Sequence, residues 1–297
     1  MEKTLRVEHM GEVSHVRAAD RAAQGAALAA WICETCGTQF ARGAVAPDRC
    51  PICDDERQYV GWGGQRWTTM GDLARDRRVS FAVEDGVVTF DLSPGFAISQ
   101  RAFLVPSGRK HVMWECLSLV TPEAIAEIES KGGVSCIAIS HPHFYAAMVE
   151  WSEALGGVPI YLHEADRRWV QRTSPLIEFW KGERLALGDE LELVRLAGHF
   201  PGSTGLWWKS GPRPGGSLFP GDALQVASDR RFVTFMYSYP NWIPLNPSVV
   251  RALRDAVAPL VFDDVFGYSR GRQIIGNARM AIDASFARYL AAIAEAA

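Results

Sequence analysis

The chain has 297 residues and a formal net charge of −3 at pH 7. That charge supplies no basic field for nucleic acid, and no apolar run approaches the ~20 residues that a membrane crossing needs. Nearly half of the residues are apolar, which is enough for one large domain with an appendage. We therefore expect a cytoplasmic protein that binds neither nucleic acid nor membranes, takes a small-molecule substrate and could form a homo-oligomer.

The first segment, residues 1–30, carries balanced charges followed by an alanine-rich run. The run lacks the strongly apolar centre of a signal peptide, so secretion is not indicated. We predict a leader over residues 1–30 that need not be ordered, and we assign it no function.

Two C-x2-C motifs follow within residues 31–68, which we predict to form a small metal-binding domain and a packed linker. Thirteen residues separate the motifs, whose cysteines are Cys33, Cys36, Cys50 and Cys53. Each motif can fold as a knuckle whose backbone amides point at the thiolates, and two knuckles close a tetrahedral shell of four thiolates. Disulfides are less favoured because no secretory signal accompanies the cysteines.

This four-cysteine segment (residues 31–68) resembles the knuckle pair of rubredoxins and rubrerythrins. The aromatic Trp31 stands two positions before Cys33, Gly37 follows the first motif, and the second motif reads C-P-x-C. A rubredoxin-like site would hold iron and pass electrons, whereas zinc in the same cage would be structural. The sequence leaves both metals open, and we favour zinc because no flavin site or second redox centre is evident.

A glycine-rich stretch with two tryptophans, residues 61–68, joins the cysteine motifs to the rest of the chain. Aromatic side chains there are expected to pack the small domain onto the large one, with Trp62 or Trp67 buried. A role of these tryptophans in contacting substrate is the less favoured alternative.

Residues 75–297 alternate strand and helix signals and are predicted to form one large α/β domain. The Asp85-Gly86 pair between β-rich runs indicates a hairpin. Thr121-Pro122 begins a helix with an N-cap and an N1 proline, and residues 247–257 and 277–296 also predict helices. Two hairpin-rich β halves, each followed by helices, suit an αββα sandwich.

Three histidines and one aspartate follow strand-like runs in this domain. His141 and His143 end one run, and their side chains lie on the same side if the backbone is extended. His199 lies in a glycine-rich turn after another run, and Asp222 follows a glycine at the end of a third. Together these four residues are a credible set of ligands for zinc, or alternatively for iron.

The order of these motifs resembles that of the metallo-β-lactamase superfamily, and of its glyoxalase II-like hydrolases in particular. His141 and His143 match the first two positions of the H-x-H-x-D-H signature. His199 matches the histidine of the third motif, and Asp222 matches the aspartate that bridges two metals. The resemblance covers roughly residues 80–297 and implies the αββα fold and metal-dependent hydrolysis.

The chain departs from this signature at the positions that hold a second metal. Tyr145 and Ala146 replace the aspartate and histidine of the signature, and Tyr268 stands where a late histidine is expected. Alanine cannot bind a metal, and tyrosine does so only as a phenolate of strongly lowered pKa. We therefore expect a single metal ion on the three histidines, with Asp222 as a fourth ligand or as the partner of a bound water.

The resulting hypothesis is a metallohydrolase that acts on an ester, thioester or lactone. Zinc would lower the pKa of a bound water toward ~7, and Asp222 would orient that water or accept its proton. Tyr145 or Tyr268 could donate a proton to the leaving group or stabilise an oxyanion. Two alternatives stay open. One is a mononuclear-iron oxidoreductase, similar to persulfide dioxygenases or coupled to electron transfer, and the other is a degenerate, non-catalytic binding protein.

Other residues have simpler interpretations. Glu115 stands where the resembled family often has an aspartate near the metal, but we expect a solvated or hydrogen-bonded carboxylate at a strand end. Cys116 and Cys136 are expected in the core. His163 ends a strand and is expected to be satisfied by hydrogen bonds, with a role beside the metal as the alternative. The aromatic side chains of residues 236–242 are expected to cap the core or to clasp a planar substrate.

Overall fold

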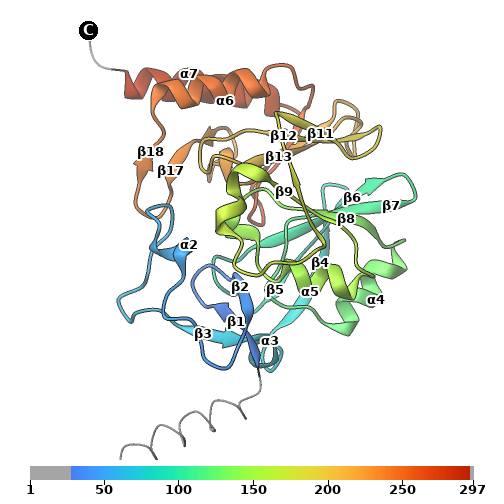
Figure 1. Ribbon diagram of the computed structural model, residues 1–297. Coiled ribbons are helices and arrows are strands. Elements are labelled where there is room, and N and C mark those ends of the chain that lie inside the picture. Colours follow the sequence, from blue (N-terminus) through green and yellow to red (C-terminus); the bar gives the residue numbers. More distant parts are fainter. Residues whose placement is uncertain (1–27, 295–297) are drawn as a thin grey trace, which may run out of the picture.

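The structure, a computed structural model, describes residues 28–294 (Figure 1). The leader predicted over residues 1–30 lies outside the described residues except at its end, where strand β1 (Ala29–Cys33) begins. Within residues 28–294, no helix combines the length and apolar character that a membrane crossing requires.

A seven-stranded mixed sheet forms the first half of the large domain, in the order β10-β9-β8-β7-β6-β5-β4. Its strands are β4 (Arg78–Glu84), β5 (Val87–Ser93), β6 (Arg101–Ser107), β7 (Lys110–Trp114), β8 (Val134–Ala138), β9 (Ile160–His163) and β10 (Ile177–Trp180). Strands β4 to β7 pair antiparallel, whereas β7 to β10 pair in parallel through helical connections. The hairpin predicted at Asp85-Gly86 is confirmed, and both turn residues have positive φ (50° and 87°).

A six-stranded sheet forms the second half, in the order β11-β12-β13-β14-β19-β20. Its strands are β11 (Arg184–Ala186), β12 (Leu191–Arg195), β13 (Thr204–Trp208), β14 (Ser217–Phe219), β19 (Asp264–Phe266) and β20 (Gln273–Ile274). The two sheets stack face to face around one apolar layer. The first sheet contributes Trp114 and Ala138 to this layer, and the second contributes Leu206 and Phe219.

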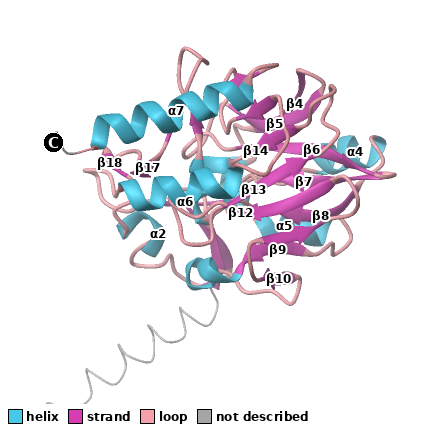
Figure 2. Cartoon of the chain, turned by 90° about the horizontal axis from the view of Figure 1, so that it is seen from above, coloured by secondary structure: helices cyan, strands magenta, loops and turns pink. Residues whose placement is uncertain are grey.

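Helices cover the outer face of each sheet (Figure 2). Helices α4 (Pro122–Ser130) and α5 (Met148–Ala154) pack on the seven-stranded sheet. Helices α6 (Pro247–Val257) and α7 (Ala278–Ile293) pack on the six-stranded sheet. The side chains of Thr121 and Asn246 cap α4 and α6 as their sequences predict, each followed by a proline. The four layers form the expected αββα sandwich.

A separate three-stranded sheet carries the four-cysteine segment, in the order β2-β1-β3. It consists of β1, β2 (Gln39–Gly43) and β3 (Trp67–Thr69), flanked by the short helices α2 (Pro51–Asp54) and α3 (Met70–Leu73). Trp67 packs edge-on against Phe40, with the ring centroids 4.8 Å apart. Trp62, by contrast, is fully exposed, so the prediction that it could be buried is wrong. The glycines around it, Gly61, Gly63 and Gly64, also have open space where a side chain would be.

Two β-ribbons of the second half lie close to the four-cysteine segment. Strand β15 (Gln225–Val226) pairs with β16 (Val233–Thr234), and β17 (Met236–Ser238) pairs with β18 (Ile243–Pro244). The side-chain amide of Asn241, in the turn between β17 and β18, donates to the backbone oxygens of Glu56 (2.7 Å) and Gln58 (3.0 Å). In Figure 1 the blue α2 region accordingly lies next to the orange β17–β18 hairpin. The four-cysteine segment is thus held by the second half of the sandwich as well as by the first.

Candidate metal centres

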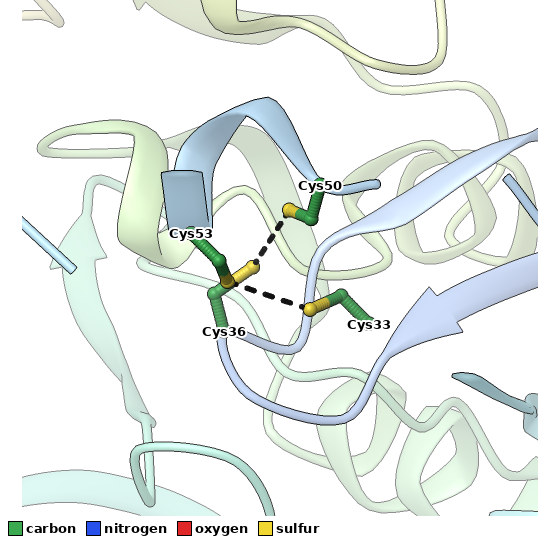
Figure 3. A group of neighbouring side chains, drawn as sticks. All are labelled: Cys33, Cys36, Cys50 and Cys53. Atoms are coloured by element: carbon green, nitrogen blue, oxygen red, sulfur yellow. Dashed lines mark hydrogen bonds between the residues drawn. The ribbon is translucent and has the colours of Figure 1, made fainter. Parts of the chain in front are cut away.

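The four cysteines of the two C-x2-C motifs converge on one point (Figure 3). Cys33 ends β1, Cys36 lies in the turn that follows, Cys50 caps α2 and Cys53 lies inside that helix. Their sulfur atoms are 3.5 Å apart for Cys33 and Cys53 and 3.7 Å apart for Cys36 and Cys50. Two thiolates bound about 2.3 Å from a zinc ion at the tetrahedral angle lie about 3.8 Å apart. The buried sulfur cage therefore has the dimensions of a tetrahedral metal site.

The protonation of the cysteine sulfurs also agrees with a cation-binding site. Hydrogen bonds from the other three cysteines lower the pKa of Cys33, and the contact with Cys33 is the main factor that raises the pKa of Cys36 and Cys53. The Gln65 side-chain amide donates to the Cys33 sulfur over 3.2 Å. Without a cation, negative charge thus concentrates on the Cys33 sulfur, while the Cys36 and Cys53 thiols hold their protons. A metal ion would replace those protons and stabilise all four thiolates.

The H-x-H motif differs in backbone shape from the sequence prediction. His141 is extended (φ −169°), but Pro142–Phe144 forms a short 3-10 helix, η1, in place of a continued strand. Proline favours the first position of such a turn, because its φ is fixed near −65°. The rings of His141 and His143 still converge, with centroids 5.1 Å apart. The motif thus brings both imidazoles together through a turn rather than through strand alternation.

His199 and Asp222 complete this second group. His199 lies in the turn between β12 and β13, and Asp222 lies in the 3-10 helix η3 (Gly221–Ala223) after β14. The four ligand atoms all lie within 4.8 Å of one another, and all four residues are buried. His143 Nδ1 is 3.3 Å from His199 Nε2, and His141 Nε2 is 3.6 Å from an Asp222 carboxylate oxygen. Two nitrogen ligands about 2.05 Å from a tetrahedral zinc ion lie about 3.3 Å apart, so this spacing fits a bound ion.

Unpartnered polar atoms support the same conclusion. Nε2 of His141 and one carboxylate oxygen of Asp222 are buried and form no hydrogen bond within the described residues. Burial lowers the pKa of His143 and lowers that of His199 to about 3, and the neighbouring His141 adds to both shifts. Burial opposes ionisation of Asp222, but the adjacent His141 outweighs it and the pKa of the carboxyl falls. Neutral imidazole lone pairs and an ionised carboxylate at neutral pH are what a divalent cation requires.

Outer hydrogen bonds fix the orientation of these rings. His199 Nδ1 donates to the backbone oxygen of Tyr237 (2.9 Å), and His141 Nδ1 is hydrogen-bonded to Ser140 Oγ (2.7 Å). The backbone amide of Ser140 in turn donates to Glu115 over 3.1 Å. Such partners select the tautomer and hold a histidine ready to bind metal.

Glu115 is 1% exposed, so the solvated interpretation of this residue is wrong and the hydrogen-bonded one is confirmed. Burial raises the pKa of its carboxyl to about 8, and the nearby charge of Asp222 adds to the effect. The folded state therefore holds the Glu115 proton more tightly than the unfolded state does. The contribution of Glu115 to stability consequently falls as the pH rises from its unfolded pKa near 4.5 to about 8.

Substituting Glu115→Gln is therefore expected to flatten the pH dependence of stability in protein without metal at the histidines. Glutamine keeps the acceptor for the Ser140 amide but cannot ionise. Between pH 5 and pH 7, the wild type should lose roughly 2–3 kcal/mol of unfolding free energy relative to the variant. Denaturant titrations across this range test the difference, with Glu190→Gln, an exposed carboxylate, as the control. Parallel curves for wild type and Glu115→Gln would contradict the expectation.

A cavity of about 290 Å³ opens beside the histidines. Its lining combines residues of both domains, namely Arg57, Gln58, Tyr59, Ile98, His143, His199, Asp222, Gln225, Tyr239, Pro240 and Tyr268. Burial, and next the charge of Asp222, raises the pKa of Tyr268, so its hydroxyl keeps its proton at neutral pH. Tyr239 donates to the backbone oxygen of Asp222 over 2.9 Å and so orders the segment that carries the carboxylate. Among the aromatic residues in 236–242, Tyr239 therefore lines the cavity and holds the Asp222 backbone, whereas Trp242 is exposed.

The structure does not place Tyr145 at this cavity, and its predicted role as a proton donor is corrected. Its hydroxyl lies 3.5 Å from the backbone oxygen of Asp166, and its ring borders a small cleft against Thr38 and Gln39 of the four-cysteine segment. The backbone amide of Gln39 donates to the oxygen of Ala146 over 2.9 Å. Two of the three positions that would hold a second metal thus face the packed boundary between the two domains.

Two residues join the two candidate metal centres, and the sequence did not indicate either of them. The buried side-chain amide of Gln100 donates to the backbone oxygens of Cys36 (2.6 Å) and His143 (3.0 Å). Arg57, which follows α2, reaches the cavity from the four-cysteine segment. Neither residue lies in a motif, and no local spacing could have indicated them. The four-cysteine segment is therefore a wall of the histidine cavity rather than a detached appendage.

The remaining sequence predictions concern residues away from the cavity. His163 accepts the Ala165 amide (3.2 Å) and donates to the Gly182 oxygen (3.1 Å), so it is a satisfied strand-end histidine. Cys116 and Cys136 are buried in the core as predicted.

Comparison with known proteins agrees with this architecture. The chain has the metallo-β-lactamase fold, and its N-terminal region carries a four-cysteine knuckle. VMB-1 superposes with a TM-score of 0.54 at 16% identity, over 73% of this chain and 99% of that chain. TMB-1 superposes with a TM-score of 0.51 at 15% identity, over 72% and 95% of the two chains. The DIM-1 metallo-β-lactamase exposed to ceftazidime gives 0.50 at 12% identity, over 73% and 95%.

One protein of known sequence is much more similar. The uncharacterized protein YmaE of Bacillus subtilis (strain 168) is 40% identical over 266 residues, which cover 89% of this chain and 96% of YmaE. The chain therefore belongs to the same family as YmaE. No protein-family model matches the chain.

Proposed function

We propose that this protein is a hydrolase that uses one metal ion, held by His141, His143, His199 and Asp222, to cleave an ester, thioester or lactone. The observation that carries this proposal is the convergence of three buried imidazoles and one buried carboxylate beside a cavity. The unpartnered Nε2 of His141, 3.6 Å from one Asp222 carboxylate oxygen, is an atom that a cation would bind, and the other Asp222 oxygen is left free within residues 28–294. The metallo-β-lactamase fold of the chain is consistent with this proposal.

The chain's own residues divide the remaining tasks. A divalent cation at this site would supply a Lewis acid and lower the pKa of water toward ~7. Asp222, whose pKa is lowered, stays ionised and can hold or accept a proton at its free carboxylate oxygen. Tyr268 keeps its proton and lines the same cavity, so it is placed to donate to a leaving group or an oxyanion. We infer a single ion because Ala146 offers no ligand for a second one, and Tyr145 faces the four-cysteine segment instead of the cavity.

Substituting Asp222→Asn tests the assigned proton acceptor. Asparagine keeps the shape of the side chain but removes its charge and its basicity, so kcat/KM for an aryl ester or thioester should fall by about 100-fold or more. Hydrolysis is measured on zinc-loaded protein, with metal content determined on the same samples. Asp229→Asn, an exposed aspartate outside the cavity, is the matched control and should keep wild-type activity. Equal activity of Asp222→Asn and wild type, at equal metal content, would overturn the role of Asp222.

A second candidate function has one specific observation in its favour. Gln100 hydrogen-bonds to the backbone of both Cys36 and His143, so a single side chain joins the two groups of ligands. Such a short connection would suit an iron oxidoreductase whose four-cysteine site passes electrons to the histidine site. Elemental analysis of protein purified without added metal separates the candidates, because zinc at both sites supports hydrolysis and coloured iron supports redox chemistry.

A further inference from the structure

One charged residue of the four-cysteine segment, Arg57, lines the histidine cavity. Arg57 is 8% exposed, and it lines the cavity together with His143, His199 and Asp222. Its guanidinium stacks between two aromatic rings, 4.6 Å from the centroid of Phe200 and 4.4 Å from that of Tyr237. Phe200 in turn packs against the imidazoles of His143 and His199, each with a centroid distance of 5.0 Å. The guanidinium and the imidazoles of two candidate metal ligands therefore contact the same aromatic ring.

Only one edge of this guanidinium is used within the described part of the protein. Nη1 donates to a carboxylate oxygen of Asp55 over 2.7 Å, and the same oxygen accepts the backbone amide of Arg57. Nε is buried without a hydrogen-bond partner in residues 28–294, and Nη2 forms no hydrogen bond to a described residue either. Nε and Nη2 make up the side-on fork that matches the two oxygens of a carboxylate. The rings fix the plane of this fork, and Asp55 holds it from the opposite edge.

Charge and shape of the cavity agree with an anionic ligand that has an apolar body. Among the lining residues, the one carboxylate is that of Asp222, a candidate metal ligand. Asp55 already occupies the first edge of Arg57. Burial raises the pKa of the Asp166 carboxyl to about 6, and this carboxyl lies near enough to Arg57 for the guanidinium charge to oppose that shift. Much of the lining is apolar or aromatic and includes Tyr59, Ile98 and Pro240. A volume of about 290 Å³ is at the lower end of the range for small-molecule sites, about 300–1,000 Å³.

We propose that Arg57 binds a carboxylate of the substrate through Nε and Nη2, so that the cavity selects carboxylate-bearing esters, thioesters or lactones. This inference rests on the proposed function, because it places the reacting bond at the histidine site. The small domain then supplies the group that recognises the substrate, and the large domain supplies the metal ligands. A purely structural Arg57 would only clamp the four-cysteine segment onto Phe200 and Tyr237, and the experiment must separate these two roles.

The experiment measures the dissociation constants of a short series of ω-mercaptocarboxylates and of the matching neutral amides by calorimetry on zinc-loaded protein. In both compounds the thiol is a ligand for the metal, and only the carboxylate is a ligand for Arg57. For the chain length that fits best, wild type should bind the carboxylate about tenfold or more tightly than the amide. The Arg57→Gln variant should lose this preference while its affinity for the amide stays within about twofold, and Arg57→Lys should keep part of the preference because it keeps the charge without the fork.

The matched control is Arg66→Gln, which removes an exposed, ion-paired arginine of the same small domain and should leave the preference unchanged. Equal affinity of wild type for carboxylate and amide would overturn the proposal, as would an Arg57→Gln variant that weakens both compounds equally. The variant His199→Ala reports separately on the proposed function. Undiminished binding of the amide to that variant would refute the metal site, whatever the preference at Arg57.

Discussion

Replacing His199 with alanine is expected to remove the metal from the histidine site and to abolish hydrolysis. The His199 ring supplies Nε2 to the group of ligand atoms, and its Nδ1 is hydrogen-bonded to the Tyr237 oxygen. Alanine has no atom that could bind the metal in place of Nε2. Loss of an outer-shell partner alone lowers metal affinity by about 10–100-fold, so loss of the ligand should exceed about 100-fold. Metal content should fall from two ions to one per chain, and kcat/KM should fall by at least about 1,000-fold, to about the level without metal.

The matched control for this experiment is His163→Gln. His163 is a buried histidine at the end of β9, and both of its ring nitrogens are satisfied by backbone groups outside the cavity. Its replacement removes an imidazole of similar burial and should leave two metal ions per chain. A His199→Ala variant that keeps both ions, or keeps its activity, would contradict the assignment of the histidine site.

The metal ligands could be found from the sequence because they follow local rules. The C-x2-C pairs and the H-x-H pair depend on spacings of two or three residues, and these spacings survive even though Pro142 turns the backbone in a way that the sequence does not predict. Helix α6 begins at the predicted residue because Asn246 and Pro247 form a local N-terminal cap. Such signals need no knowledge of which domain lies against which.

The contacts between the domains could not be found in this way. Tyr145 follows the H-x-H motif directly, which predicts a place in the cavity, yet its hydroxyl faces Asp166 and its ring faces the four-cysteine segment. Arg57 looks like an ordinary charged residue of a loop, and only the folded chain stacks it on Phe200. Glu115 could not be told from a solvated carboxylate, because its burial depends on the neighbouring turns at Ser140 and Gly221. Each of these residues is defined by a partner that is distant in sequence.

The small domain is expected to depend strongly on a metal ion at its four cysteines. Apart from the cysteines, few large side chains are buried in it, with Ile32, Phe40 and Ile52 as the main examples. Binding of a structural zinc ion contributes about 10–16 kcal/mol to the folding of comparable knuckle peptides, far more than so small a core can supply. The large domain has two apolar clusters of its own, and a third cluster also includes the four cysteines, Phe40 and Ile52 of the small domain. The histidine ligands follow strands of the two sheets of the large domain. Loss of the metal from the four cysteines should therefore unfold one wall of the cavity and leave the histidine ligand group in place.

The double substitution Cys36→Ser and Cys50→Ser is the test of this dependence. Backbone amides of residues 29–69 should lose their protection from hydrogen exchange, whereas strands β5 to β8 should keep theirs. The protein should retain one metal ion, at the histidines, but hydrolysis should fall by more than about tenfold, because Arg57, Gln58 and Tyr59 leave the cavity with the unfolded segment. Cys136→Ser, which changes a buried thiol of the large domain, is the control and should preserve both ions and the exchange pattern. If the double variant instead exchanges and hydrolyses like wild type, the metal of the four cysteines is dispensable and the small domain folds on other contacts, such as those of Gln39 and Gln100 with the H-x-H turn.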